Sequence, residues 1–240
     1  MYVSMKQEME SMSGEGQITG VSMISAASIP TSERAKFMDG VMEVEYNSWP
    51  PELVGERSRY ESRMEIFPEG FISALEGGKT RGFTVSEIVN YDPDTKKTWD
   101  ELTDNGTFKR SHNPQGDSLY VSTVVVSKDA QGKRIGEKLV NEQKEVVKRL
   151  GLQRLFLGAR IPGYDEYCRE NGDIAVEDYL ELTNEKGESV DPEIRFYKRQ
   201  GLYPAKVIPD FEPDTESRDF GVVMMWQNPQ NPQTLPLNKL

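Results

Sequence analysis

The segment between Leu119 and Gly158 limits the possible folds of this 240-residue chain more than any other part of its sequence. Residues 119–126 contain five β-branched side chains and predict a buried strand. A turn follows, and apolar side chains then recur along one face of a helix, at Ile135, Leu139, Val146 and Leu150. A second apolar run, Gly151–Gly158, predicts another strand. The order strand, helix, strand is typical of a right-handed parallel crossover, so the sequence predicts an α/β fold.

The turn inside this segment, Gln131–Gly136, has the features of a phosphate-binding site. It leads into a helix N-terminus, where unpaired N–H groups and the positive end of the helix dipole favour an anion. Lys133 and Arg134 add positive charge. Many α/β proteins also join a strand to a helix through glycine for steric reasons alone, and this alternative stays open. Neither G-x-G-x-x-G nor G-x-x-x-x-G-K-[ST] is present, which argues against a dinucleotide-binding Rossmann site and a P-loop.

Gln131 and Gly136 are the first and last residues of a pattern that resembles the acyl-CoA-binding motif of the GNAT acetyltransferase superfamily, [Q/R]-x-x-G-x-[G/A]. In that family the motif follows a strand and wraps the pyrophosphate of coenzyme A. Arg134 stands where the family usually has glycine. We expect an arginine there to keep a negative φ, with its Cβ directed away from the diphosphate. The resemblance implies an α/β GNAT fold, with a mixed central sheet whose strands splay at the acyl-CoA site and helices on both faces. It also implies acetyl-CoA or coenzyme A as a substrate.

A second motif lies further along the chain, in Phe196–Leu202. It resembles the F-Y-x-x-x-G-F element that follows the CoA-binding strands in GNAT enzymes. Asp191 is a suitable N-cap, Pro192 suits the first helical position and Gly201 suits the C-terminal cap, so a short helix is predicted. The resemblance implies that Tyr197 protonates the departing CoA thiolate. A tyrosine that only packs on the sheet is the alternative.

The resemblance also implies roles for the residues between these motifs. Backbone groups of Val124–Val126 would bind pantetheine, and a backbone N–H near Val125 would polarise the thioester carbonyl. The pyrophosphate would contact the turn formed by Gln131, Gly132, Lys133, Arg134, Ile135 and Gly136. No general base is evident from the sequence; the carboxylates that could face the acceptor are Glu45, Glu87, Asp165 and Glu166.

The segment after the second strand resembles a particular GNAT subgroup. Its R-I-P-G-Y sequence, Arg160–Tyr164, is similar to that of GNAT domains fused to carbon-nitrogen hydrolases or found in polyketide loading modules. Some of these relatives have a histidine at the position of Asp165. The leading hypothesis is N-acetyl transfer from acetyl-CoA to an amine on a small molecule or protein, by direct attack in a ternary complex. An S-acetyltransferase or decarboxylase that loads an acyl carrier protein, and a non-catalytic CoA-binding module, remain alternatives.

The amino-acid composition limits the partners, the cellular location and the metal sites that we expect. A net charge of −11 and a pI near 4.8 argue against nucleic acid or an anionic membrane as partners and mildly favour an amine-bearing partner. Cys168 is the single cysteine, so an intramolecular disulfide is excluded and a reducing, cytoplasmic location is expected. His112 is the single histidine, in a turn-rich segment, and we expect it to be solvated; no metal site is expected.

We expect three parts in the chain: a mobile segment 1–29 with a possible first strand at 20–25, a single GNAT domain 30–227 and a flexible tail 228–240. Helices are predicted at 31–48 and 52–66, a hairpin at 70–75 and 81–91, and an acidic helix at 174–182. Strands are predicted at 203–207 and 220–226. The long polar connection 92–117 is interpreted as a flap over one edge of the site.

Overall fold

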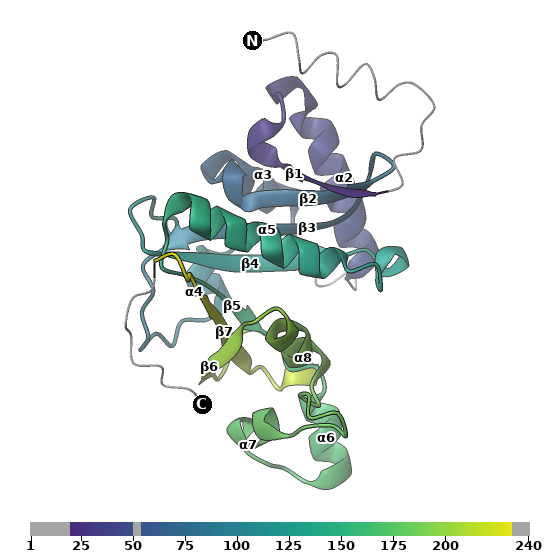
Figure 1. Cartoon of the computed structure of the whole chain (residues 1–240), viewed down its shortest axis with the longest axis vertical. Helices are drawn as coiled ribbons and strands as arrows, with labels where there is room; N and C mark the ends of the chain where they lie inside the picture. Colours follow the sequence, from purple (N-terminus) through teal and green to yellow (C-terminus); the bar gives the residue numbers. More distant parts are fainter. Residues whose placement is uncertain (1–19, 50–53, 232–240) are drawn as a thin grey trace.

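The computed structural model describes residues 20–49 and 54–231, and these residues build one seven-stranded mixed sheet with helices on both faces (Figure 1). The strand order is β1-β2-β3-β4-β5-β7-β6, and every neighbouring pair is antiparallel except β4 and β5. The strands are β1 (Val21–Ser25), β2 (Phe71–Glu76), β3 (Lys79–Val89), β4 (Ser118–Val126), β5 (Arg154–Ala159), β6 (Tyr203–Ile208) and β7 (Gly221–Gln227). The predicted mixed GNAT sheet and its strand positions are confirmed.

Helix α5 (Ile135–Leu150) covers one face of the sheet, as the crossover pattern predicted. Ile135, Leu139 and Val146 are buried with Leu119 and Val121 of β4 in one apolar cluster. Leu150 was expected on the same buried face but is 42% exposed, because the helix ends there and Gly151 turns the chain with a φ of 65°.

Helices α2 (Arg34–Ser48) and α3 (Arg57–Ile66) cover the opposite face, where Val41 and Val44 pack with Phe83 and Val125. The first predicted helix is confirmed, but Tyr46 is 64% exposed rather than on the buried side. Two residues after Val44 correspond to about 200° of rotation around a helix, so Tyr46 points outward. The second predicted helix is shorter than expected, and the first part of its predicted range, 52–53, lies outside the described residues.

The connection between β3 and β4, predicted to be a flap over one edge of the site, is folded onto the rest of the protein, and its role as a flap stays a prediction. Its short helix α4 (Trp99–Thr103) begins with a capping box formed by Thr98 and Glu101. The Trp99 N–H donates to the Phe211 carbonyl at 2.9 Å, which ties the connection to the segment after β6. Phe108 within it is fully buried.

Three short helices follow β5 (Figure 1): α6 (Tyr164–Asn171), α7 (Val176–Glu181) and α8 (Pro192–Arg199). The acidic helix is confirmed as α7, which buries Val176, Tyr179 and Leu180. Helix α6 was not predicted. The tail was expected to be loose from residue 228, but Asn228 is fully buried and donates to the Leu152 carbonyl at 2.7 Å. Residues 1–19 and 232–240 of the predicted terminal segments lie outside the described part of the chain.

Candidate functional site

The parallel strands β4 and β5 separate soon after they begin. They pair only between Ser118–Tyr120 and Arg154–Phe156, although β4 continues to Val126 and β5 to Ala159 (Figure 1). A bulge helps β4 turn away, since Val85 pairs with Thr123 and Ser86 with Val121, which leaves Ser122 between them. The result is a gap in the strand pairing of the sheet, between the later parts of β4 and β5, and β4 leads from it to the turn before α5.

The pairing of β4 with β3 decides which backbone groups face this gap. The Ser127 N–H donates to the Arg81 carbonyl at 2.9 Å, and the same register pairs Val125 with Phe83. Hydrogen-bonded and non-hydrogen-bonded pairs alternate in an antiparallel ladder, so Val125 bonds to β3, whereas the N–H groups of Val124 and Val126 point toward the gap. The N–H groups that face the gap therefore belong to Val124 and Val126, and the N–H of Val125 is taken by the sheet; a donor to the thioester near Val125 stays a prediction.

The turn after β4 has an unusual backbone. Gly132 has a φ of 79° and Arg134 a φ of 59°, while Lys133 between them has no positive φ. The expectation that Arg134 keeps a negative φ is wrong: the last residue before α5 requires the left-handed conformation, and arginine adopts it here at a steric cost. Backbone whose φ alternates in sign forms a concave surface of N–H groups that suits anions. The geometry explains why the family usually has glycine at this position.

The charged side chains of the turn are paired with carboxylates. Lys133 Nζ lies 2.9 Å from both carboxylate oxygens of Glu76, and Arg134 binds Glu137 through two hydrogen bonds of 2.8 and 2.7 Å. The hydrogen bond from Arg134 lowers the pKa of Glu137. Gln131, Gly132, Lys133 and Arg134 are all exposed, so an anion could reach them from solvent.

Ile135 anchors the turn in the protein interior: its side chain is 1% exposed and belongs to the main apolar cluster. Gly136 lies against helix α8, since a Cβ on it would be 3.2 Å from Phe196 Cζ and 3.7 Å from Val126 Cγ2. The small residue at the end of the motif therefore brings α5, α8 and the end of β4 together at the mouth of the gap.

Helix α8 begins as the sequence predicted. The Asp191 carboxylate accepts from the N–H groups of Glu193 and Ile194 at 2.9 and 3.0 Å, and Gly201 has a φ of 74°. Tyr197 is buried, and its hydroxyl makes no hydrogen bond within 20–49 and 54–231. Burial raises the pKa of Tyr197 well above its ordinary value, so the phenol is protonated at neutral pH. Burial also raises the pKa of Glu193, one turn earlier in α8, to about 8.

The four candidate bases occupy different environments. Glu45 is buried and accepts from the Gly55 N–H at 2.9 Å, and Glu166 is exposed. Asp165 is held by Arg218 and Arg169 at 2.9 and 2.8 Å, and the hydrogen bond from Arg218 lowers its pKa. These ion pairs explain how an aspartate is stabilised where some relatives have histidine.

Glu87 differs from the other three candidates. It lies in β3 with no exposed surface, and its Oε2 accepts from Ser111 Oγ at 2.7 Å. Its Oε1 is buried, and no partner is found for it in the part of the chain that the structure describes. Burial raises the pKa of Glu87 to about 8.

Sequence reasoning missed Arg63, a buried cation close to the β4 bulge. Its guanidinium donates to the Gly106 carbonyl at 2.6 Å and to Thr123 Oγ1 at 3.3 Å. The rings of Tyr60, Trp99 and Phe108 surround it at 4.8, 5.5 and 5.2 Å from their centroids. An arginine in an amphipathic helix is usually a surface residue, so only the folded connection between β3 and β4 makes its burial visible.

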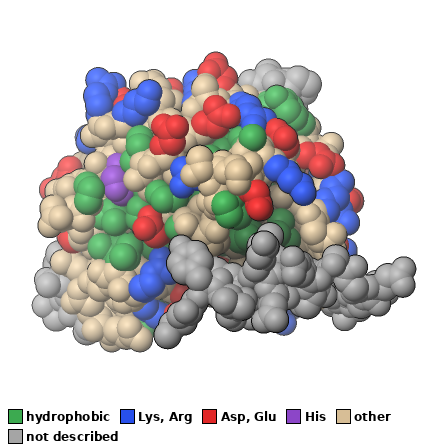
Figure 2. Space-filling model, turned by 90° about the horizontal axis from the view of Figure 1, so that it is seen from above, with side chains coloured by type: hydrophobic (Ala, Val, Ile, Leu, Met, Phe, Trp, Pro, Cys, Tyr) green, Lys and Arg blue, Asp and Glu red, His purple; other side chains and the backbone are tan. Residues whose placement is uncertain are grey.

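His112 was predicted to be a solvated loop residue; it does lie in the loop before β4, but its side chain is half-buried. Its ring stacks on Phe67 with centroids 5.1 Å apart, and Nδ1 accepts from the Ile88 N–H at 3.2 Å. Burial lowers the pKa of His112. In Figure 2 its side chain, coloured purple, reaches the surface beside hydrophobic side chains. It therefore attaches the connection to β3.

No helix within 20–49 and 54–231 is long and apolar enough to cross a membrane. Comparison with known folds gives TM-scores of 0.72 and 0.70 for the loading GNATL domain of CurA from Lyngbya majuscula and the GphF GNAT-like decarboxylase in complex with isobutyryl-CoA. Both alignments cover 87% of this chain, with 98% of the first structure and 99% of the second, at 17% and 19% identity. An aminoglycoside 6'-N-acetyltransferase complexed with coenzyme A has a TM-score of 0.55 at 17% identity, over 86% of this chain and 97% of that one. These likenesses show a shared fold.

Sequence comparison gives relatives of higher identity. The chain is 36% identical over 181 residues to the uncharacterized N-acetyltransferase YkwB of Bacillus subtilis (strain 168), covering 75% of this chain and 78% of YkwB. It is 29% identical over 195 residues to the probable hydrolase YhcX of the same organism, covering 80% of this chain but 37% of YhcX. The model of the acetyltransferase (GNAT) family matches residues 35–165. This match over more than half of the chain, with the identity to YkwB, shows that the chain belongs to the acetyltransferase (GNAT) family, as its motifs predicted.

Proposed function

We propose that this protein transfers an acetyl group from acetyl-CoA to an amine by direct attack while both substrates are bound. The observation that carries the proposal is the unpaired edge of β4, where the N–H groups of Val124 and Val126 face a gap instead of a neighbouring strand. A backbone polar group left unpaired in the interior costs about 1–3 kcal/mol. The pantetheine arm of coenzyme A carries amide groups that would satisfy such an edge.

The turn Gln131–Gly136 would hold the pyrophosphate. Its alternating backbone and the first turn of α5 offer N–H groups to an anion. Lys133 and Arg134 are exposed and would add positive charge beside the pyrophosphate. In the structure they pair with Glu76 and Glu137, respectively. Ile135 fixes the helix start in the core, and Gly136 leaves space beside Phe196.

The acyl group would then lie beside the bulged part of β4. An N–H of Val124 or Val126 would donate to the thioester oxygen, and one such donor supplies about 2.7–4 kcal/mol toward a tetrahedral transition state. The Tyr197 hydroxyl, protonated at neutral pH, would give its proton to the departing thiolate.

One structural likeness favours a second candidate, the loading of a carrier protein. The CurA and GphF domains share the fold of this chain. An acyl carrier protein would then be the partner, with a thiol instead of an amine as acceptor. The ion-paired Asp165 lacks the acid–base capacity of a histidine, and for this reason we place amine transfer first.

The test begins with binding. Coenzyme A and acetyl-CoA should raise the thermal midpoint with concentration, with dephospho-CoA as the comparison ligand, because a ligand of the native state stabilises it by mass action. Mass spectrometry after incubation with acetyl-CoA and either primary amines or a phosphopantetheinylated carrier protein then identifies the acceptor. Acetylated amines support the proposal; a loaded carrier, or carbon dioxide release from malonyl-CoA, supports the second candidate. No midpoint shift with any CoA species would contradict both.

A further inference from the structure

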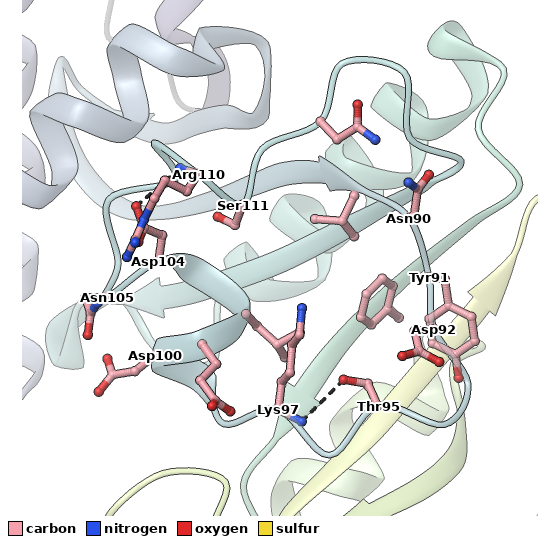
Figure 3. A pocket seen from close by; sticks show the side chains of 15 residues that line it. Asn90, Tyr91, Asp92, Thr95, Lys97, Asp100, Asp104, Asn105, Arg110 and Ser111 are labelled. Atoms are coloured by element: carbon pink, nitrogen blue, oxygen red, sulfur yellow. Dashed lines mark hydrogen bonds and ion pairs between the residues drawn. The ribbon is translucent and has the colours of Figure 1, made fainter.

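A cavity of about 650 Å³ lies under the folded connection between β3 and β4 (Figure 3). In Figure 3, Asp104, Arg110 and Ser111 form one wall and the segment carrying Asn90–Thr95 forms another. The cavity lies on the face of the sheet opposite α5, because Phe156 in its lining packs with Tyr120, whereas Leu155 and Leu157 pack with α5. Its size is that of a small-molecule site.

The position of Phe156 relates this cavity to the gap in the sheet. Phe156 pairs with Tyr120 and is the last residue of β5 that pairs with β4. The cavity therefore reaches the point where the two strands begin to separate. A molecule in the cavity would therefore lie on the face of the sheet opposite α5, beside the start of the gap in which the acyl donor is proposed to bind.

The charges around the cavity favour a cation. Its lining has more acidic than basic side chains: Asp92, Asp100, Glu101 and Asp104 against Lys97 and Arg110. Asp104 and Arg110 neutralise each other through a hydrogen bond of 2.7 Å. Glu101 is occupied by the Thr98 N–H of the capping box. Asp100 is exposed, and no ion pair of its side chain is found within the described ranges.

A buried carboxyl group, that of Glu87, lies behind one wall of the cavity. Ser111 lines the cavity, and its hydroxyl donates to Glu87 at 2.7 Å. The other carboxylate oxygen of Glu87 is buried and unpartnered within the described ranges, so this carboxyl is poorly stabilised as an anion.

The charged and titratable groups that face Glu87 come from three elements. They are Arg63 of α3, Asp104 at the end of α4 and Tyr120 of β4. Arg63 gives its hydrogen bonds to Gly106 and Thr123 instead of Glu87. Burial consequently dominates, and it holds the pKa of Glu87 near 8, close to the pH at which a general base is most effective.

We infer that the cavity is the acceptor site and that Ser111, backed by Glu87, takes the proton from the amine bound there. This inference rests on the proposed acetyl transfer and names its acceptor: a small polar amine with a second positive charge, placed near Asp100. An N–H proton of the ammonium passes to Ser111 Oγ while the serine proton passes to the Glu87 carboxylate. The free amine attacks the thioester carbon, and the carbon–sulfur bond breaks as the thiolate takes the proton from Tyr197. The second proton of the attacking nitrogen then passes through solvent to the Tyr197 phenolate, and Glu87 releases its proton to solvent, which leaves a neutral amide and restores both groups.

The test uses the full chain, acetyl-CoA and two probe amines, 1,4-diaminobutane and butylamine, with CoA release followed between pH 6 and 10. The variants are Glu87→Gln and Ser111→Ala. Ser58→Ala is the matched control, because Ser58 also donates to a glutamate, Glu56, but on the exposed surface. Thermal midpoints with and without coenzyme A are measured for every protein.

We expect the wild type to prefer the diamine by about tenfold in kcat/KM, and its rate to rise with pH and level off near the pKa of Glu87, about 8. Both variants should lose on the order of 10²-fold in kcat/KM, and their rates should keep rising toward pH 10, where the amine loses its proton unaided. The control should match the wild type. The coenzyme A midpoint shift should be the same in all four proteins.

Two kinds of result overturn the inference. If coenzyme A shifts the midpoint but neither amine is acetylated, or if the variants keep the wild-type rate and pH profile, the cavity is not the acceptor site while the cofactor proposal stands. Loss of the coenzyme A shift in the variants also overturns it, since that loss indicates a structural role for Ser111 and Glu87. If the wild type itself shows no shift, the proposed function fails and the inference fails with it.

Discussion

Tyr197→Phe isolates the proposed acid from everything else that the tyrosine does. The ring is buried in the main apolar cluster, and phenylalanine keeps that packing. The hydroxyl makes no hydrogen bond within the described residues, so its removal breaks none in the resting protein. Unfolding free energy should therefore change by less than about 0.5 kcal/mol. Turnover should fall by about 10²–10⁴-fold, which corresponds to about 2.7–5.4 kcal/mol of transition-state stabilisation.

The chain offers a matched control in Tyr179, which is also buried but has a structural hydroxyl. It donates to Asp191 Oδ2 at 3.2 Å, and Asp191 caps helix α8. Tyr179→Phe should cost about 1.5–3 kcal/mol of stability, because a hydrogen bond to a charged group is lost, with little change in turnover. Tyr197→Phe should thus lose turnover but keep stability, whereas Tyr179→Phe should lose stability but keep turnover.

The assays are chemical denaturation for stability and steady-state CoA release for rate. For Tyr197→Phe, kcat and kcat/KM should fall equally, since the interaction exists only in the transition state. A rate within about threefold of the wild type would refute the assignment of Tyr197 as the acid. A strong drop in stability or in coenzyme A affinity would also refute the reasoning, because it requires the hydroxyl to be idle in the resting protein.

Three further predictions concern the turn and the buried carboxyl. Arg134→Gly should keep or raise the thermal midpoint, because glycine adopts a φ of 59° without strain, and should weaken coenzyme A binding by about threefold to tenfold through the lost charge; tighter binding would mean that the arginine obstructs the site. Gly136→Val should cost about 1–3 kcal/mol of stability and abolish the coenzyme A midpoint shift, because the new side chain meets Phe196; an unchanged shift would contradict the arrangement of α5 and α8. Glu87 has its pKa raised from 4.5 to about 8, so its contribution to stability is present at low pH and is lost as pH rises from 4.5 through 8. Glu87→Gln should therefore gain in midpoint relative to the wild type between pH 6 and pH 9, and equal pH dependence of the two proteins would contradict the buried neutral carboxyl.

Local sequence patterns were sufficient to predict the strand and the two helices that surround the candidate site. The β-branched run of β4, the spacing along α5 and the Asp191, Pro192 and Gly201 signals around α8 each act within a few residues, so the sequence displays them directly. The family motifs then joined these elements into one cofactor site. The roles of the individual residues in that site stay predictions.

Features that depend on tertiary contacts could not be predicted. The direction of the Val125 N–H follows from the register with β3 and the bulge at Ser122, which no local pattern encodes. The left-handed Arg134 is visible only once the turn is built. Glu87 accepts a hydrogen bond from Ser111, which lies 24 residues further along the chain. Sequence spacing could not distinguish the burial of Glu87 in β3 from a solvated position.

The brief pairing of β4 with β5 divides the sheet mechanically. Three consecutive residue pairs, Ser118–Tyr120 with Arg154–Phe156, are the only strand pairing within the described ranges that joins the β1–β4 half to the half formed by β5, β7 and β6. Beyond Phe156, changing the angle between the halves breaks no ladder hydrogen bond, whereas bending the sheet at any other line would break several. Along this line the two halves of the sheet therefore share fewer ladder pairs than any other neighbouring strands in the described ranges, and side-chain packing, such as that of Tyr120 with Phe156, joins them as well.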